Sequence, residues 1–251
     1  MRFYGDLARL AWNADELGHA EVTLGVPRSV KDAVESSGVP HTEVDLVLVN
    51  GESVGFERLL AEGDRISVFP PFHRLDIEQL TQVRPPPLPQ PRFVLDVHLG
   101  RLTRRLRLLG FDCLYRNDYS DDELADLARD HRCLLTRDRG LLMRRCVTHG
   151  CLLRSDEAPR QAVEVVSRFD LEDRLAPFSR CIRCNGNLLP VDKNAVRHRL
   201  EARTRTHHDD FSQCGSCRRL YWRGSHHASL SSFVEDVRHA TRDGLASQPS
   251  A

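Results

Sequence analysis

The sequence predicts an α/β fold, in which a parallel sheet with flanking helices is preceded by a small β-rich domain and followed by a four-cysteine module. Three observations predict it. Between residues 92 and 176, apolar runs of strand length alternate four times with helical patterns, which is typical of a parallel sheet. Two CxxC pairs follow Pro177. A proline-rich stretch separates the middle of the chain from its first 74 residues.

The clearest boundary lies between Gln82 and Arg92, where five prolines fall within 11 residues. Neither a helix interior nor a central strand accommodates them, so this stretch is predicted to be a stiff extended linker. The composition changes again near Pro177. The predicted segments are a first domain (1–74), a linker (75–91), an α/β domain (92–176), a cysteine module (177–230) and a C-terminal tail (231–251).

The composition excludes several classes of protein. Forty per cent of the residues are apolar and 29% are charged, which rules out a collagen-like, coiled-coil or fully disordered chain. No stretch approaches 18 apolar residues, so no membrane span is expected. The N-terminus lacks the pattern of a signal peptide, and the eight cysteines fit one metal site better than a disulfide framework. We therefore expect a cytoplasmic protein.

The formal net charge of zero conceals an asymmetry along the chain. Residues 1–100 contain 9 basic and 15 acidic side chains, whereas residues 177–230 contain 10 basic and 4 acidic ones. A basic surplus near the end of the chain predicts that this part meets an anion such as nucleic acid.

In the first domain, the pattern predicts a strand, then a helix, and then a hairpin followed by a further strand. Ser29 is the expected N-cap of the helix and Gly38 its stop. The run VDLVLVNGESV predicts a hairpin with Asn50-Gly51 in the turn, and GDRISVFPPF predicts a strand that two prolines end.

These motifs resemble the small β-grasp proteins, which are ubiquitin-like, and most closely the ThiS/MoaD-type sulfur carriers. The VNG turn, Leu60, Gly63-Asp64 and Phe69-Pro70-Pro71 carry the resemblance. Such carriers end in a free Gly-Gly whose carboxylate is activated, but here Phe72-His73-Arg74 follows and the chain continues. The resemblance therefore implies an adaptor or docking domain with a protein partner. A sulfur-transfer partner is the weaker alternative, because its chemical group is missing.

Each predicted strand of the middle domain ends in an aspartate, and the next helix follows directly. The four residues are Asp96, Asp118, Asp138 and Asp156. In an open parallel sheet, ligands bind outside the carboxyl ends of the strands, where such side chains can converge. Ser120 and Glu123 form a predicted capping box on the second helix, whose first turn also carries Asp121 and Asp122.

Each of these aspartates could equally be a helix cap, since aspartate is a preferred N-cap residue. Taken together, converging carboxylates need a counter-charge. Two like charges ~4 Å apart cost about 4 kcal/mol at an effective dielectric of 20. A hard divalent cation such as Mg²⁺ or Mn²⁺ removes this repulsion, and it supports phosphodiester hydrolysis when bound.

Nearly all of the chain, to about Leu230, resembles one protein family. The motifs FVLDVHLGRLTRRLRLLGFD, CLLTRDRGLL and RCxxCN…CxxC…YWxGSH resemble the bacterial family named for the C-terminal domain of the nematode Mut-seven protein. That family combines a PIN-like ribonuclease fold with a zinc ribbon, and many members carry a ubiquitin-like N-terminal domain.

The resemblance implies a ribonuclease that uses Mg²⁺ or Mn²⁺. By its motifs, Asp96 is the first acid, Asp138 the late acid and Asp156 a fourth. The helical acid maps to Asp122, with Asp121 and Glu123 as close alternatives.

The two CxxC pairs predict a structural zinc site. The ligands would be Cys181, Cys184, Cys214 and Cys217. Two-residue spacing lets both sulfurs of a pair face one ion, and four thiolates leave no open coordination position. The pairs are separated by 29 residues, so the intervening segment is expected to loop out. His226 and His227 are alternative ligands, and a redox role for the thiols is a weaker possibility.

The cysteine module also has the composition of a single-stranded RNA-binding surface. Arginines interleave with Tyr221 and Trp222, which would supply charge for phosphates and flat faces for bases. Packing of the two aromatic rings inside a small domain is the competing interpretation. The candidate RNA-binding residues are Arg101, Arg104, Arg199, Arg203 and Arg205.

The sequence thus predicts RNA hydrolysis at an acidic Mg²⁺ or Mn²⁺ site, in which a metal-activated water attacks the phosphodiester. A non-catalytic RNA-binding or adaptor protein with the same fold and zinc is the main alternative. It gains support if the carboxylates do not converge or serve as caps.

Overall fold

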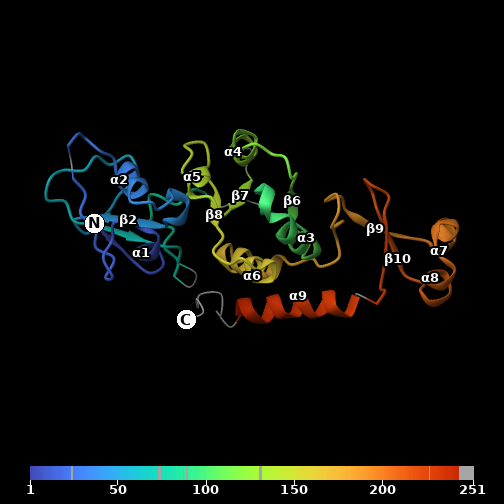
Figure 1. Ribbon diagram of the computed structural model, residues 1–251. Coiled ribbons are helices and arrows are strands. Elements are labelled where there is room, and N and C mark those ends of the chain that lie inside the picture. The colour runs from blue at the N-terminus through green and yellow to red at the C-terminus, as the bar shows by residue number, and fades with distance from the viewer. Residues whose placement is uncertain are drawn as a thin grey trace. The chain divides into compact units, whose positions relative to one another are not determined.

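Figure 1 shows the computed structural model of the chain, which describes residues 1–23, 25–72, 75–86, 88, 90–129, 132–225 and 227–242. The chain forms two compact units. The first combines Met1–Gln90 with Tyr119–Leu153, and the second combines Pro91–Asp118 with Arg154–Ala251. These units cut across the predicted domains, whose boundaries stay a prediction.

The N-terminal part of the first unit is a four-stranded sheet packed on a helix. The strand order is β1-β4-β2-β3, with β1 parallel to β4 and the other pairs antiparallel. The elements are β1 (Arg2–Phe3), α1 (Leu7–Leu10), α2 (Val30–Ser36), β2 (Leu46–Val49), β3 (Glu52–Ser53) and β4 (Ile66–Phe69). This arrangement confirms the small sheet domain that the sequence predicts.

Local sequence signals explain two of these elements. Ser29 caps α2 by accepting the Asp32 amide hydrogen, and the Asp32 carboxylate accepts the Ser29 amide in return. Asn50 and Gly51 join β2 to β3 with φ angles of 55° and 90°, the left-handed pair that a tight hairpin turn requires. Both predicted signals are confirmed.

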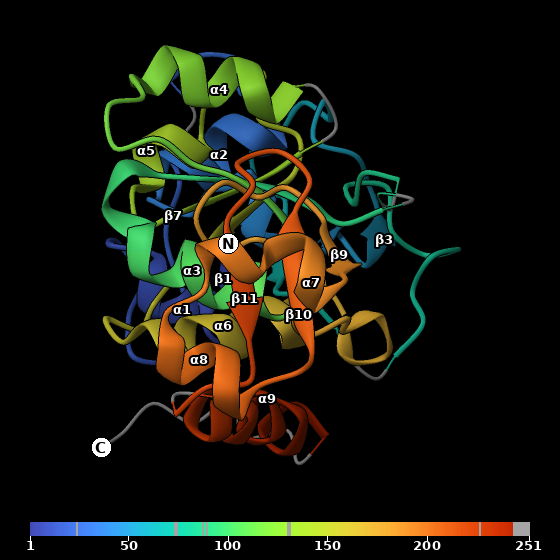
Figure 2. The same ribbon diagram turned by 90° about the vertical axis from the view of Figure 1, so that its right-hand side faces the viewer.

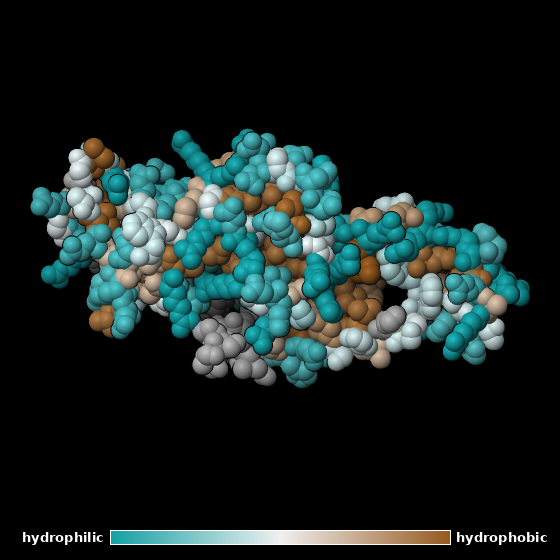
Figure 3. Space-filling model, in the orientation of Figure 1, coloured by the Kyte–Doolittle hydropathy of each residue, from teal (hydrophilic) through white to brown (hydrophobic). Residues whose placement is uncertain are grey.

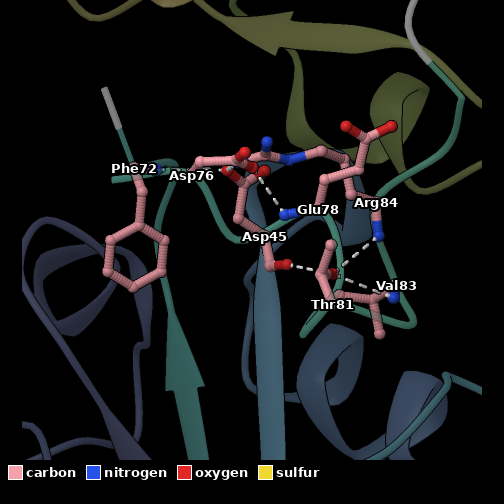
Figure 4. Close-up of polar contacts among 7 residues, drawn as sticks. All are labelled: Asp45, Phe72, Asp76, Glu78, Thr81, Val83 and Arg84. Atoms are coloured by element: carbon pink, nitrogen blue, oxygen red, sulfur yellow. Dashed lines mark hydrogen bonds and ion pairs between the residues drawn. The ribbon is translucent and has the colours of Figure 1, made fainter. Parts of the chain in front are cut away.

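A clasp around Asp45 holds the segment after β4 against this sheet (Figure 4). The buried Asp45 carboxylate accepts the Phe72 amide hydrogen at 3.1 Å and forms an ion pair with Arg84. The Thr81 hydroxyl donates to the Asp45 carbonyl and accepts the amide hydrogens of Val83 and Arg84, each at 3.2 Å.

Part of the predicted linker is therefore folded. Ile77 and Val83 are only 3% and 8% exposed. Their apolar side chains and the Asp45 clasp explain why these residues pack. Residues 73 and 74, which follow Phe72, lie outside the described residues, as do 87 and 89.

The 3-10 helix η1 (His41–Glu43) covers the end of strand β8 (Gly150–Leu152) in the same unit. The buried Glu43 carboxylate accepts the Leu152 amide hydrogen at 2.8 Å. His41 Nε2 lies 2.8 Å from the Val147 carbonyl oxygen. Strand β8 comes last in the order of its sheet, so Glu43 occupies a backbone donor that would otherwise be open to pairing with another chain.

The middle of the chain forms a parallel sheet of order β6-β5-β7-β8 with flanking helices, as predicted. Strands β5 and β6 belong to the second unit, and β7 and β8 belong to the first. The remaining elements are β5 (Arg92–Leu95), η2 (Val97–Leu99), α3 (Gly100–Leu108), β6 (Asp112–Leu114), α4 (Asp121–Arg129), β7 (Cys133–Thr136), α5 (Arg139–Leu142), α6 (Ala158–Arg168) and η3 (Glu172–Arg174).

Two sequence patterns account for the helices of this domain. The inner face of α3 is fixed by buried leucines spaced three and four residues apart, namely Leu99, Leu102, Leu106 and Leu109. Ser120 and Glu123 form the predicted capping box at the start of α4, with bonds of 2.8 and 3.2 Å.

The cysteine module (177–230), called the ribbon from here on, contains a three-stranded antiparallel sheet of order β11-β10-β9 (Figure 2). Its elements are β9 (Leu188–Val191), α7 (Lys193–Val196), η4 (Arg197–Arg199), α8 (Ala202–His207), β10 (Phe211–Cys214) and β11 (Leu220–Trp222). The segment between the two CxxC pairs thus contains strand β9 and short helices. Val196, Leu200 and Phe211 form the small core that holds these helices on the sheet.

The segment after residue 230, predicted as a tail, instead forms helix α9 (His227–Arg242). The sequence prediction was wrong here because the apolar stripe is short and broken by polar residues. Phe233, Val234 and Val237 are buried, and α9 packs beside α6 in the second unit (Figure 1). Arg105 also lies over the Phe233 ring, 4.4 Å from its centroid. Residues 243–251 are outside the described residues.

Hydrophilic side chains cover most of the face drawn in Figure 3, with apolar atoms showing between them. Among the residues that the structure describes, no helix has both the length and the apolar content to cross a membrane.

Candidate functional site

The four predicted zinc ligands lie together in the ribbon. Their sulfur atoms are all within 4.8 Å of one another, with Cys181 Sγ 3.7 Å from Cys217 Sγ and Cys184 Sγ 3.4 Å from Cys214 Sγ. Four thiolates bonded tetrahedrally to zinc at ~2.3 Å would have their sulfurs about 3.8 Å apart. The donor set and its spacing therefore fit a zinc ion, and four thiolates fill its coordination sphere.

The two CxxC pairs share one backbone geometry. Asn185 and Arg218, each just after the second cysteine of its pair, have φ angles of 71° and 61°. Their amide hydrogens bond to the carbonyl oxygens of Cys181 and Cys214 at 2.9 and 3.0 Å. These turns direct both sulfurs of a pair to one side, as a shared metal requires.

Tyr221 supports the site from outside. Its hydroxyl lies 3.0 Å from Cys181 Sγ. Burial alone would raise the pKa of the Cys181 thiol, but hydrogen bonds from Tyr221 and from the backbone lower this pKa to about 6. Burial and the same bond raise the pKa of Tyr221. Tyr221 is therefore held inside the ribbon by its contact with Cys181.

The alternative histidine ligands are not in this group. His227 stacks on Phe178 with ring centroids 4.8 Å apart, and its Nδ1 lies 3.3 Å from the Ser231 hydroxyl. His226 lies outside the described residues. Among the described residues, the four cysteines are the group whose spacing suits a metal ion.

The first cysteine pair is joined to strand β6 by a buried arginine. Arg107 is 6% exposed, and its guanidinium donates to the Cys113 carbonyl at 2.8 and 3.2 Å. It also donates to the carbonyls of Ile182 and Arg183 at 3.3 and 2.9 Å. Burial lowers the pKa of Arg107, but an arginine stays protonated across the pH range of a folded protein.

Asn185 makes a second link to the same strand. Its side-chain oxygen accepts the Cys113 amide hydrogen at 3.0 Å, and its amide group donates to Asp112 at 2.9 Å. Neither linking role, that of Arg107 or that of Asn185, is predicted from the sequence. The asparagine directly after a CxxC pair was the available signal, because asparagine tolerates the left-handed backbone found there.

Replacing Arg107 by methionine should lower the free energy of unfolding by about 2–4 kcal/mol and speed the loss of zinc. The change removes the donor that three carbonyl oxygens share, and each buried acceptor left without one costs roughly 1–3 kcal/mol. Urea unfolding and the rate of zinc transfer to a chromogenic chelator measure the two effects. Arg104→Met, on the exposed face of the same helix, is the control. Equal values for both variants would contradict the linking role of Arg107.

Asp138 is the N-cap of α5. Its Oδ1 accepts the amide hydrogens of Gly140 at 2.7 Å and Leu141 at 3.4 Å. The other carboxylate oxygen, Oδ2, takes part in neither bond. The capping role that was the competing interpretation is therefore present, and it occupies one of two oxygens.

The acids at the start of α4 divide between a cap and ion pairs. Glu123 is used by the capping box. Asp122 forms an ion pair with Arg144 Nη1, and Asp121 lies 3.7 Å from Arg144 Nη2. The Asp122 side chain is 88% exposed. Hydrogen bonding to Asp122 raises the pKa of Arg144. The positive charge of Arg144 therefore balances the negative charge of Asp122.

The other two candidate acids lie in the second unit. Asp96 is half-buried at the end of β5, and its side chain does not cap η2. The Tyr115 hydroxyl donates to the next carbonyl, that of Val97, at 2.8 Å. Asp156 is exposed after β8. Since Asp122 and Asp138 belong to the first unit, convergence of the four acids stays a prediction.

Asp118, the remaining strand-end aspartate, is paired locally. A hydrogen bond from Arg116 Nε at 2.8 Å lowers the pKa of its exposed carboxyl. This local pair accounts for the residue as part of a turn.

The candidate RNA-binding arginines occupy exposed positions. Arg101 and Arg104 lie on the outer face of α3. Arg199 donates to the Arg218 carbonyl at 2.7 Å, whereas Arg203 and Arg205 lie two residues apart on α8 and so point in different directions. Of the three ribbon arginines, Arg203 lines an open groove of about 1850 Å³.

Comparisons with known proteins add the family. A family model described as Mut7-C RNAse domain matches residues 91–234, which is more than half of the chain. A second, described as Mut7-C ubiquitin, matches residues 1–76. Neither the curated proteins nor the solved structures gave a match. The parallel sheet, the four-cysteine ribbon and the small N-terminal sheet domain agree with these two matches. The chain belongs to the Mut7-C RNAse domain family and carries a Mut7-C ubiquitin domain at its N-terminus.

Proposed function

We propose that this protein hydrolyses phosphodiester bonds of single-stranded RNA at an acidic site that depends on Mg²⁺ or Mn²⁺. The observation that carries the proposal is the match to an RNAse domain family across residues 91–234. That range contains an acid after each strand of the parallel sheet. Carboxylate oxygens are the ligands that these hard cations prefer.

In this proposal, Asp96, Asp122 and Asp138 hold the cation and Asp156 assists. The Asp96 side chain does not cap η2, and Asp138 has one oxygen outside its cap. Arg144 must release Asp122, or move with it, when the cation binds. A bound divalent cation would activate water and stabilise the leaving oxygen.

The RNA is proposed to lie along the basic surfaces of the second unit. Arg101 and Arg104 follow Asp96 on α3, and Arg199, Arg203 and Arg205 belong to the ribbon. The triple change of the ribbon arginines to alanine would weaken binding to all sequences alike, because phosphate contacts carry no sequence information.

The test is cleavage of a labelled single-stranded RNA by the full-length protein. Wild type should cleave when Mg²⁺ or Mn²⁺ is added and should stop when the cation is omitted. Asp96→Asn should abolish cleavage, because the neutral amide lacks the negative charge that offsets the charge of the cation. Cleavage that persists undiminished in Asp96→Asn would reject the assigned site.

A non-catalytic RNA-binding protein with this fold is the second candidate. Two observations favour it: Asp138 caps α5, and Asp122 is paired with Arg144. In that case RNA binds without being cleaved under either metal, and Asp96→Asn leaves binding unchanged.

Two further proposals concern the role of the N-terminal domain and the location of the protein in the cell. The ubiquitin-like domain is proposed to act as a docking domain for a protein partner. Sulfur transfer has no support from the residues present, because the chain continues past Phe72. A cytoplasmic location is proposed because the four metal-binding thiols must stay reduced.

A further inference from the structure

The ribbon contains an open groove that is lined by arginines and by an exposed tryptophan. It lies wholly within the second unit, and Figure 3 shows the surface hollowed beside the start of α9. Strands β10 and β11, helix α8 and the first turn of α9 contribute to its wall. Arg203, His207, Arg219, Trp222 and Arg223 are exposed in it.

Trp222 presents a free aromatic surface to this groove. Its indole is 42% exposed, while its inner side leans on Phe211 with ring centroids 6.3 Å apart and a tilt of 50°. The neighbouring Tyr221 is committed to Cys181. The two aromatic residues that looked alike in the sequence therefore have different roles: Tyr221 belongs to the metal site, and Trp222 faces solvent.

The charge of the groove favours a polyanion. Five basic and three acidic side chains line it. Two of the acids are already engaged: Asp209 pairs with Lys193 at 2.7 Å, and Asp192 caps α7 by accepting the Asn194 amide hydrogen. Arg203, Arg219 and Arg223 therefore give the groove its positive character.

We propose that this groove is a base-stacking site for single-stranded RNA, in which the Trp222 indole stacks on a nucleobase and Arg203, Arg219 and Arg223 contact the flanking phosphates. A flat ring beside positive charge is how proteins bind single strands with little sequence preference. A duplex keeps its bases stacked inside and offers none to Trp222, so the groove selects single strands. The inference rests on the proposed function only in taking RNA as the ligand.

The experiment uses Trp222 as its own reporter. The chain has two tryptophans, so Trp12→Phe in the full-length protein leaves Trp222 as the only one. A decamer of adenylate RNA is added without Mg²⁺ or Mn²⁺, so binding is measured apart from hydrolysis. The indole fluorescence should be quenched by the single strand and much less by an adenylate–uridylate duplex of the same length.

Two variants in this background locate the contacts by anisotropy of fluorescein-labelled decamer. Trp222→Leu should weaken binding about 10-fold, the loss of one stacked base. Arg203→Ala should reduce the slope of log affinity against log salt by about 0.7, the loss of one phosphate contact. Arg197→Ala removes the same charge from an exposed residue outside the groove lining and should change little.

Zinc content, measured for each variant, shows that the ribbon is intact. RNA that binds by anisotropy without quenching Trp222, or a duplex that binds as tightly as the single strand, would overturn the inference. Weakening by Arg197→Ala equal to that by Arg203→Ala would also overturn it. None of these results depends on whether the protein cleaves RNA, so the groove and the proposed hydrolysis fail separately.

Discussion

Cys181→Ser will release zinc and unfold the ribbon, with the loss reaching strand β6. Structural zinc sites in small fingers contribute roughly 10–16 kcal/mol, and this binding energy is folding energy. The ribbon has little else to replace it, because its core is three buried residues with two partly buried neighbours. Without the ion, the four sulfurs lose the centre that holds the two CxxC turns together.

The links of Arg107 and Asn185 determine how far the damage spreads. The Cys113 amide hydrogen bonds to Asn185, which directly follows the first cysteine pair. In Cys181→Ser this amide should exchange with solvent, while amides of β2 and β4 in the first unit keep their protection. Elemental analysis for zinc and hydrogen exchange by mass spectrometry measure both effects.

Cys146→Ser is the matched control, since Cys146 is half-buried and lies outside the metal-binding group. It should retain one zinc per chain and normal exchange. A Cys181→Ser protein that retains zinc, or a wild type purified without chelator that has none, would contradict the structural role of the metal. Exchange confined to the ribbon would show that β6 does not depend on it.

The elements that the sequence predicts well are those whose signal is local. The leucine stripe of α3 follows from a spacing of three and four residues, and the Ser120 capping box follows from a spacing of three. The CxxC pairs predict a group of four thiols, because two-residue spacing lets both sulfurs of a pair face one ion. The structure brings these four sulfurs together. In the helix signals and within each CxxC pair the partners lie within a few residues, so the sequence itself displays the interaction.

The features that the sequence does not reveal depend on partners far along the chain. Arg107 looks like its neighbours in RLTRRLR, yet its acceptors include carbonyls 75 and 76 residues away. Helix α9 has a weak apolar stripe and is stabilised by packing on α6. Ile77 and Val83 come before the prolines that indicate a linker, and the sequence does not show the contact between Asp45 and Arg84 that holds this segment in place.

The candidate acids could be predicted from the sequence only in part: their positions are clear, but their roles are not. Aspartate after a buried strand is expected both for a ligand and for a cap, because the end of a parallel strand is also the start of the next helix. The structure shows that Asp138 caps and that Asp96 does not, which the sequence motif could not distinguish. Substitution by asparagine separates the two roles at Asp138.

Asp138→Asn should leave the stability of the protein nearly unchanged and reduce RNA cleavage by orders of magnitude. Asparagine caps a helix about as well as aspartate, and its side-chain oxygen can accept the same two bonds from Gly140 and Leu141. As a ligand, however, asparagine lacks the charge that a divalent cation needs. Without metal the variant is expected to be as stable as wild type or slightly more so, because any repulsion from neighbouring carboxylates is relieved.

The measurements are urea unfolding without divalent metal and cleavage of a labelled single-stranded RNA with Mg²⁺ or Mn²⁺. Asp118→Asn is the matched control, since Asp118 also follows a strand but is exposed and paired with Arg116. It should cleave like wild type. If wild type, Asp138→Asn and Asp96→Asn all cleave equally, the acids are wrongly assigned. If no variant, wild type included, cleaves with either metal while the RNA still binds, Asp138 is a cap alone and the protein binds RNA without hydrolysing it.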